Sequence, residues 1–391
     1  MQIKKMLKLG ILIIVCIAVG IFLYSHMHAD YILEPQAADQ KVFEEEHVDI
    51  ESPNFPEHFT KEVSELLTFD VEVVTGETFS AQAFQAATAI RCPVDVEKVY
   101  SYFMGEEKEV SSVKYENYFD MEGYASPITV YENRGRGLSI AAYDFIFYQS
   151  PQIDYIENSF YPNPSVDNYN AYLFSKEEDL EFMDRKAAWQ FVVKAMEDLG
   201  VDMSDAVSRV TYSLDVETLE KEEECIDVNG NEVEGEKNPE WSKSDEGYYY
   251  YITQSYMGIP FFASKKLEAD EETEAPLRIF QTEEGILSAN LQRWFQVEQQ
   301  DEVMYFTDFE NIMYTIEEKY SGTIHTNPLS VEKAQLYVFP IKTNDDIYTL
   351  TPVWVCTIAE NHIDWGEEAY ISYIYIPINA ITGEEMLVLE N

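Results

Sequence analysis

The sequence predicts an α+β fold: an N-terminal transmembrane helix followed by antiparallel sheets, each packed by one helix. Three observations support this prediction. Residues 9–24 form an uncharged apolar run, LGILIIVCIAVGIFLY. Two helical patterns, near residues 180–199 and 309–320, are each followed by about four strand-like segments, which predicts two repeated helix-plus-four-strand units in the C-terminal part. Strands and helices do not alternate as in βαβ units, which disfavours a doubly wound parallel sheet.

The apolar run near the N-terminus is the predicted membrane anchor. It holds 16 residues, which is short for a span of about 20, and residues 7–24 serve if Lys8 snorkels. Three lysines lie among the first eight residues, so we expect a single-pass protein of the cell membrane, with a cytoplasmic N-terminus and an extracytoplasmic body. A cleaved signal peptide or a lipoprotein is the alternative, but no small-x-small site follows Tyr24 and no small residue stands just before Cys16.

Composition divides the rest of the chain. Residues 30–59 contain three prolines and the run Glu44-Glu45-Glu46 with little periodicity, as expected of a spacer. The predicted organisation is a cytoplasmic tip and signal-anchor (1–29), an acidic linker (30–59), a mixed α+β domain (60–175) and the two helix-plus-sheet units (176–300 and 301–391).

The mixed domain contains signals of both kinds of secondary structure. Residues 62–67 suggest a short helix. Apolar residues at helical spacing predict a second helix over residues 95–104, which Gly105 ends. Strands are expected at 113–119, 128–132 and 138–148, with a turn at 134–137 before the last of them.

The first helix-plus-sheet unit begins with Ser175-Lys176-Glu177-Glu178, a capping box that predicts a helix N-terminus. Gly200 is expected to end this helix. The predicted core residues of the helix are Leu180, Ala187, Phe191 and Leu199. Strands are expected at 208–219, 248–256, 277–282 and 286–297, with a hairpin at 225–234.

The second unit repeats this order. Thr307-Asp308-Phe309-Glu310 is a second capping box, and Gly322 is expected to end the helix that follows. Its predicted core residues are Phe309, Ile312 and Ile316. Strands are expected at 335–341, 351–358, 370–378 and 384–389.

The end of the chain carries a family resemblance. Pro377-Ile378-Asn379-Ala380-Ile381-Thr382-Gly383-Glu384 resembles the closing hairpin of PepSY-type domains, and residues 350–354 and 256–260 resemble segments of YycH/YycI-type proteins. The resemblance covers about residues 175–391. It implies extracytoplasmic, PepSY-like domains that regulate a sensor histidine kinase.

Charge and cysteine content limit the possible partners and chemistry. The chain has 73 acidic and 26 basic residues, for a formal charge of −47, so it repels nucleic acid and anionic surfaces. The four cysteines, Cys16, Cys92, Cys225 and Cys356, are widely spaced, which is neither a disulfide framework nor a metal-binding pattern. One disulfide remains an open alternative.

The sequence contains no recognisable catalytic signature. No HExxH, GxSxG, phosphate-binding or dinucleotide-binding motif occurs. Residues 227–231 are reminiscent of a calcium loop, but the glycine is at the wrong position, which favours a turn. His362 and Asp364 could form a dyad, although an exposed loop histidine is the better interpretation. We therefore predict no catalytic residues, no metal site and no cofactor.

Two aromatic segments are the candidate partner-binding sites. Tyr249, Tyr251 and Tyr256 lie in a tyrosine-rich strand, which is either an aromatic contact surface or an ordinary half-buried strand. His362 and Trp365 lie in a loop between two strands. The predicted function is a non-catalytic extracytoplasmic protein that binds or regulates another cell-envelope protein, such as a sensor kinase. A ligand- or cation-binding module and an envelope hydrolase are the alternatives.

Overall fold

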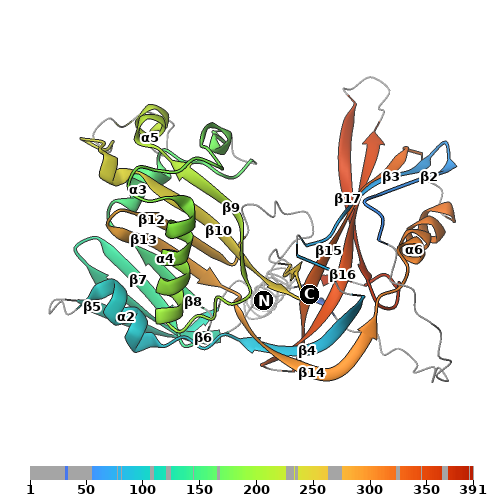
Figure 1. Ribbon diagram of the computed structural model, residues 1–391, viewed down its shortest axis with the longest axis horizontal. Helices are drawn as coiled ribbons and strands as arrows, with labels where there is room; N and C mark the ends of the chain where they lie inside the picture. The colour runs from blue at the N-terminus through green and yellow to red at the C-terminus, as the bar shows by residue number, and fades with distance from the viewer. Residues whose placement is uncertain are drawn as a thin grey trace, which may run out of the picture.

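Two large β-sheets, one nine-stranded and one seven-stranded, make up most of the chain (Figure 1). The computed structural model describes residues 31–33, 55–76, 78–80, 82–105, 110–119, 125–143, 145–164, 168–225, 233, 237–262, 275–322, 326–344, 346–362, 369–386 and 388–390. Two short strands, β1 (Tyr31–Leu33) and β18 (Val388–Glu390), form a separate ladder. Each large sheet is the centre of one lobe of the molecule.

The nine-stranded sheet is antiparallel throughout. Its order is β11 (Ile259–Pro260), β10 (Gly247–Tyr256), β12 (Leu277–Thr282), β13 (Gly285–Gln292), β8 (Phe145–Gln149), β7 (Arg136–Ala141), β6 (Ala125–Asn133) and β5 (Ser111–Phe119), and β9 (Ala206–Leu214) pairs with β10. Helices α2 (Val96–Met104) and α4 (Arg185–Asp198) cover one face (Figure 1). Helices α3 (Ile153–Glu157) and α5 (Val216–Glu222) pack on a second core.

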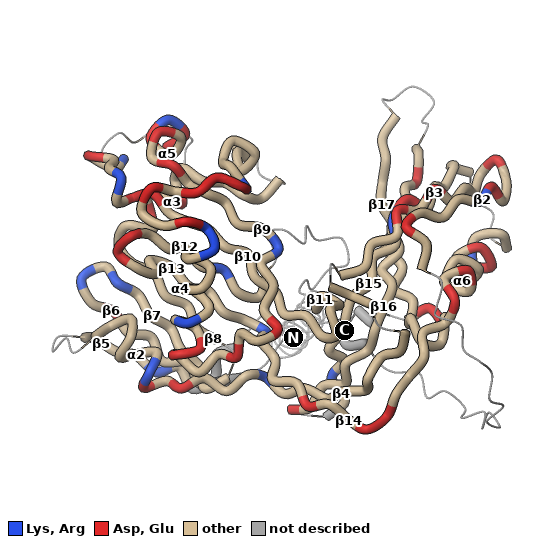
Figure 2. Tube along the Cα trace, in the orientation of Figure 1, with Lys and Arg blue, Asp and Glu red and all other residues tan. Residues whose placement is uncertain are grey.

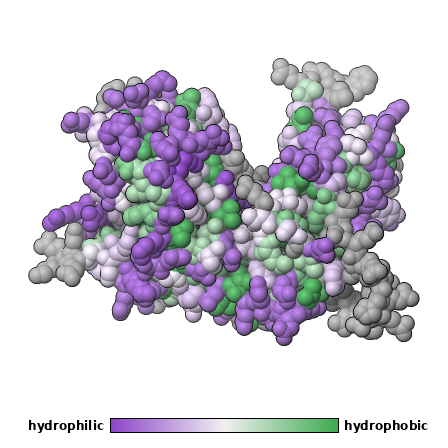
Figure 3. All heavy atoms as spheres, in the orientation of Figure 1, coloured by the Kyte–Doolittle hydropathy of each residue, from purple (hydrophilic) through white to green (hydrophobic). Residues whose placement is uncertain are grey.

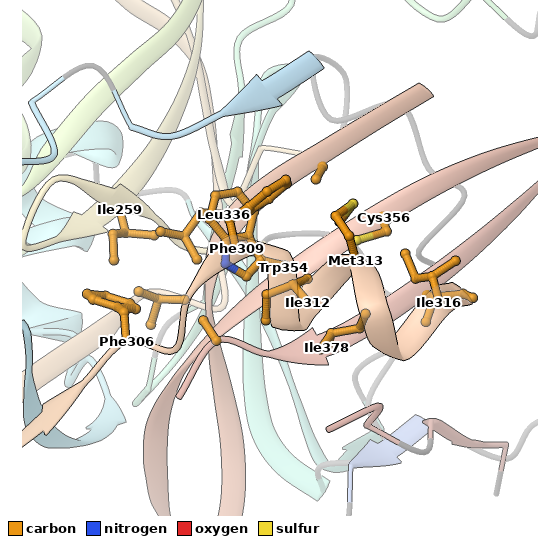
Figure 4. Close-up of a cluster of buried hydrophobic side chains, with 14 of the residues drawn as sticks. Ile259, Phe306, Phe309, Ile312, Met313, Ile316, Leu336, Trp354, Cys356 and Ile378 are labelled. Carbon is orange, nitrogen blue, oxygen red and sulfur yellow. The ribbon is translucent and has the colours of Figure 1, made fainter. Parts of the chain in front are cut away.

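The seven-stranded sheet combines strands from both ends of the described chain. Its order is β14 (Phe295–Tyr305), β4 (Ala83–Arg91), β16 (Ile347–His362), β15 (Leu329–Asn344), β3 (Leu67–Val74) and β2 (His58–Ser64), and β17 (Tyr370–Asn379) pairs with β16. The β3–β15 pair is parallel, whereas the other pairs are antiparallel. Helix α6 (Phe309–Ser321) covers one face of this sheet and buries Phe309, Ile312 and Ile316 (Figure 4).

The predicted fold class is therefore wrong: the protein is mostly β, with two large sheets and only five α-helices in the described residues. The two repeated helix-plus-four-strand units do not occur. Strands from residues 58–91 pair with strands from residues 295–379, and strands from residues 111–149 pair with strands from residues 206–292. Periodicity reports only local conformation, so it could not reveal this long-range pairing.

The predicted membrane-spanning helix is not part of the fold that the structure describes. Within the described ranges, no helix is long and apolar enough to cross a bilayer. The apolar run at residues 9–24, where the span was expected, lies outside those ranges and is shorter than the usual span of about 20 residues. The predicted fold, with an N-terminal membrane-spanning helix, is therefore not the fold of the described residues.

Helix α2 confirms its sequence prediction. The Asp95 carboxylate accepts a hydrogen bond from the Lys98 backbone N–H at 3.1 Å, which satisfies a free donor of the first turn. Gly105 ends the helix at φ +65°, and its N–H donates to the Ser101 carbonyl at 3.2 Å. Val99 and Phe103 face the sheet and are buried.

Helix α4 begins later than predicted. The Ser175 hydroxyl does accept hydrogen bonds from the N–H groups of Glu177 and Glu178, but it caps a turn instead of a helix. The helix begins at Arg185 because the Asp184 carboxylate accepts the Ala187 N–H at 2.8 Å. This start changes which residues face the sheet.

The predicted core of α4 is correct only in part. Leu199 is buried, but the Phe191 side chain is 36% exposed, so its prediction as a core residue is wrong. The buried residues of the helix are Ala188, Val192, Ala195 and Met196.

Three other predicted elements differ from the structure. Residues 62–67 belong to the β2–β3 hairpin instead of a helix. The strand predicted at 208–219 ends at Leu214, and Asp215 then caps α5 by accepting the Thr218 N–H at 2.9 Å. The segment 286–297 divides into β13 and β14 at Arg293, which has φ +56°.

The β10–β11 hairpin joins the two lobes. Its two turn residues, Met257 and Gly258, have φ +54° and +80°, as in the type I′ turns that suit two-residue hairpins. At this end of the nine-stranded sheet, Tyr256, Ile259 and Phe261 enter the hydrophobic core of the seven-stranded sheet. The hairpin therefore fixes the position of one lobe against the other.

Candidate binding edge on the seven-stranded sheet

Strand β17 lies at an edge of the seven-stranded sheet. It pairs with β16 from Val353↔Asn379 to His362↔Tyr370 without a register shift. At its C-terminal end, the following segment covers the outer side of the strand through the bridge Ile378↔Glu385. Among the described residues, no strand pairs with the outer side of β17 between Tyr370 and Ile376.

The backbone groups that point to this outer side can be identified from the covered end. The Asn379 N–H donates to the Glu384 carbonyl at 2.9 Å, and the Met386 N–H donates to the Pro377 carbonyl at 2.8 Å. Residues of odd number therefore direct their backbone groups outward, because these directions alternate along a strand. The same holds for Ile371 and Tyr373, which lie in the uncovered part.

The side chains of these two residues are also accessible. Ile371 is 52% exposed and Tyr373 is 50% exposed. Ile374, Ile376 and Ile378 pack instead into the core that contains α6, so side chains of odd number lie on the opposite face of the sheet. Figure 3 shows hydrophobic atoms at the surface of this lobe, beside the hollow between the two lobes.

Among the edge strands of the two large sheets that are longer than two residues, β17 is the one that carries no charged residue in the described structure. The charged residues on the other edges of the two large sheets are Lys61 and Glu62 on β2, Lys114 on β5, Arg209 on β9, and Glu298, Asp301 and Glu302 on β14. Figure 2 shows acidic residues in red at the bend beside the β14 label. The two-residue edge strand β11 contains Pro260. Charges and proline protect exposed edges from pairing with other chains, and residues 370–376 of β17 lack both.

A polar cluster lies on the α6 side of the same strand end. The His362 Nε2 atom is 2.8 Å from the Ser372 Oγ atom and 3.5 Å from a carboxylate oxygen of Glu360. The Asn327 Nδ2 atom is 2.8 Å from the other Glu360 oxygen and 3.1 Å from His362 Nδ1. The imidazole also stacks on the Tyr370 ring, with 4.4 Å between centroids.

This geometry does not form a nucleophile–base pair. The Asn327 Nδ2 atom faces both Glu360 and the Nδ1 atom of His362, and an amide nitrogen can only donate. A neutral imidazole in this contact therefore accepts at Nδ1 and carries its proton on Nε2. The proton on Nε2 faces the Ser372 hydroxyl, where a general base would need a free lone pair. The Glu360 carboxylate also approaches Nε2, whereas the orienting acid of a catalytic triad binds the other nitrogen.

The tyrosine-rich strand β10 provides packing instead of a contact surface. Tyr251 is 1% exposed and Tyr256 is 4% exposed, while Tyr249 is partly buried against the Phe160 ring. The Tyr256 hydroxyl donates to the Gln85 carbonyl at 3.0 Å. Tyr251 and Tyr256 therefore leave almost no side-chain surface for a partner. Burial raises the pKa of Tyr250, whose hydroxyl has no hydrogen-bond partner in the described structure.

The structure therefore places the predicted candidate residues in different environments. His362 belongs to the polar cluster at the edge of β17, and Trp365 lies outside the described residues. Sequence reasoning missed Ser372 and Asn327, and it also missed Ile371 and Tyr373. The uncharged alternation of tyrosine and isoleucine in residues 370–376 was the available signal, but it does not reveal that the strand lies at an edge.

The described residues contain no group of metal-binding side chains. No cluster of three or more His, Cys, Asp or Glu side chains able to hold a metal ion occurs among them. Cys92, Cys225 and Cys356 are buried, and burial raises the pKa of the Cys356 thiol. Buried thiols with a raised pKa are poor nucleophiles at neutral pH.

Comparisons with known proteins inform the fold alone. No protein family matches the chain, and no curated protein matches it. A crystal structure of an uncharacterized protein from Eubacterium rectale ATCC 33656 is similar, with a TM-score of 0.55 and 15% sequence identity over 85% of this chain and 94% of that chain. The resemblance to PepSY-type and YycH/YycI-type proteins stays a prediction.

Proposed function

We propose that this protein is a non-catalytic binding module that captures an extended segment of another protein along the outer edge of β17. In this mode of recognition, the segment adds a strand to the sheet and exchanges backbone hydrogen bonds with its edge. The observation that carries the proposal is the uncharged edge of residues 370–376, whereas the other edge strands of the two large sheets, β2, β5, β9, β11 and β14, carry charges or proline.

The accessible groups at the edge suit this kind of partner. The N–H and C=O groups of Ile371 and Tyr373 supply the backbone hydrogen bonds, and their half-exposed side chains supply apolar contact area. The PepSY-like resemblance suggests a cell-envelope protein, such as a sensor kinase, as the source of the segment. The lysines and apolar residues near the N-terminus support a place of action outside the cytoplasm.

Replacing Tyr373 by proline tests the proposal. Proline removes the outward N–H but no bond to β16, and proline is tolerated where an edge N–H faces solvent. The probe is a fluorescent seven-residue peptide of alternating valine and glutamine, measured by fluorescence anisotropy. We expect Tyr373→Pro to weaken binding about tenfold through the lost hydrogen bond and the bulk of the ring.

Tyr373→Phe is the matched control, because it keeps the backbone N–H and most of the ring. We expect this variant to bind the peptide within about twofold of the natural protein, since only an exposed hydroxyl is lost. Equal binding by the proline variant and the natural protein would exclude strand addition at β17. Circular dichroism and thermal unfolding check that both variants are folded.

A further inference from the structure

We infer that the segment bound at β17 carries a lysine or arginine beside Ser372, where its side chain reaches the Glu360 carboxylate. This inference rests on the proposed function, because it names the chemistry of the partner at the same edge. The argument uses the surroundings of Glu360, the spacing of the strands and the charge of the whole protein.

The Glu360 carboxylate lacks a permanent cationic partner in the described structure. One oxygen accepts a hydrogen bond from the Asn327 amide, which is neutral. The other lies 3.5 Å from the Nε2 atom of His362, an imidazole that is a cation only when it is protonated. The Glu360 side chain is 24% exposed, so its charge is partly desolvated and would gain from a neighbouring cation.

The strand geometry brings an added side chain within reach of this carboxylate. Glu360 is opposite Ser372 in the β16–β17 ladder, so both side chains lie on the same face of the sheet. A strand added beside β17 places one of its residues next to Ser372, about two strand spacings, or roughly 9.6 Å, from Glu360. The long stem of lysine or arginine and the shorter stem of glutamate span that gap together, and the small Ser372 side chain leaves the path open.

The face of the sheet opposite Ser372 determines which side chains fit on either side of the basic residue of the segment. Residues on either side of the cation would place their side chains beside Ile371 and Tyr373, both half-exposed and apolar or aromatic. The fitting pattern is therefore apolar–basic–apolar, as alternation along a strand requires. The formal charge of −47 attracts such a cationic segment over long range and opposes pairing with a second copy of the chain.

The test is a double-mutant cycle with two seven-residue peptides and two proteins. Both peptides have valine at alternate positions, with either lysine or glutamine in between. The proteins are the natural chain and Glu360→Gln, which keeps the shape of the side chain and an oxygen for Asn327. We expect the natural chain to prefer the lysine peptide by about tenfold or more at low salt, and Glu360→Gln to lower this preference about fivefold.

The remaining preference of Glu360→Gln reports the long-range attraction, which should fall as salt is added. An unchanged lysine preference in Glu360→Gln would overturn the inference. If both peptides bind equally and Tyr373→Pro still weakens binding about tenfold, the inference fails while the proposed function stands. Failure of both peptides to bind, or binding that Tyr373→Pro leaves intact, overturns the proposed function and the inference together.

Discussion

Replacing Trp354 by alanine is expected to lower the free energy of unfolding by about 3–5 kcal/mol. Trp354 is fully buried in the core between α6 and the seven-stranded sheet (Figure 4). Its ring makes edge contacts with Phe55 and Phe309, each with 5.2 Å between centroids. The substitution would leave a large cavity that these neighbours cannot fill. Denaturant unfolding followed by tryptophan fluorescence and circular dichroism measures the change.

Two further variants test whether the loss of stability comes from the buried ring of Trp354. Tyr314→Ala removes an aromatic side chain that is 59% exposed on the outer side of α6, so we expect a loss of less than about 1 kcal/mol. Trp354→Phe should cost less than Trp354→Ala, because phenylalanine keeps an aromatic ring and leaves a smaller cavity. Neither variant loses a hydrogen bond of the indole N–H, which has no partner in the described structure. A loss below about 1 kcal/mol for Trp354→Ala would mean that this core is misplaced.

Gly76→Ala is expected to destabilise the protein by about 3 kcal/mol, the upper end of the usual cost of overpacking. A Cβ atom at residue 76 would lie 1.6 Å from the carbonyl oxygen of Gly258, in the hairpin that joins the two lobes. The obstacle is backbone, and a Cβ at Gly258 would itself approach the Phe79 nitrogen to 2.7 Å. The hairpin must therefore shift, which disturbs Tyr256 and Ile259 in the core.

Gly137→Ala is the control for this prediction. A Cβ atom at residue 137 would meet no atom within 4 Å, so the expected change in stability is within about 0.5 kcal/mol. The comparison uses thermal and denaturant unfolding of all three proteins. Similar stability of Gly76→Ala and Gly137→Ala would show that the hairpin does not approach residue 76 as described.

Local signals in the sequence predicted local structure well, but they failed where contacts between distant residues determine the structure. Asp95 and Gly105 mark the ends of α2, because both cap interactions lie within a few residues. Ser175 misled the placement of α4, since a serine hydroxyl caps turns as readily as helices. The parallel pairing of β3 with β15 joins residues more than 250 positions apart, and no local pattern encodes it.

The candidate site shows the same limit. His362 was recognised as a residue of interest, but its contact with Ser372 arises from the β16–β17 register. Residues 370–378 were correctly expected to form a strand, while their position at an edge depends on the order of all the strands in the sheet. The tyrosines of β10 were candidates for a contact surface in the sequence. They are buried in the structure because α4 packs on one face of the strand and α3 and α5 pack on the other, and no local pattern predicts that packing.

Amide hydrogen exchange along β17 tests the central claim most directly. In the natural chain without peptide, the N–H groups of Ser372 and Ile374 point to β16, whereas those of Ile371 and Tyr373 point outward. Exchange is measured by nuclear magnetic resonance with and without the valine–lysine peptide. Strand addition predicts that Ile371 and Tyr373 become protected by about tenfold or more while Ser372 and Ile374 change little. Unchanged exchange at Ile371 and Tyr373 in the presence of saturating peptide would contradict it.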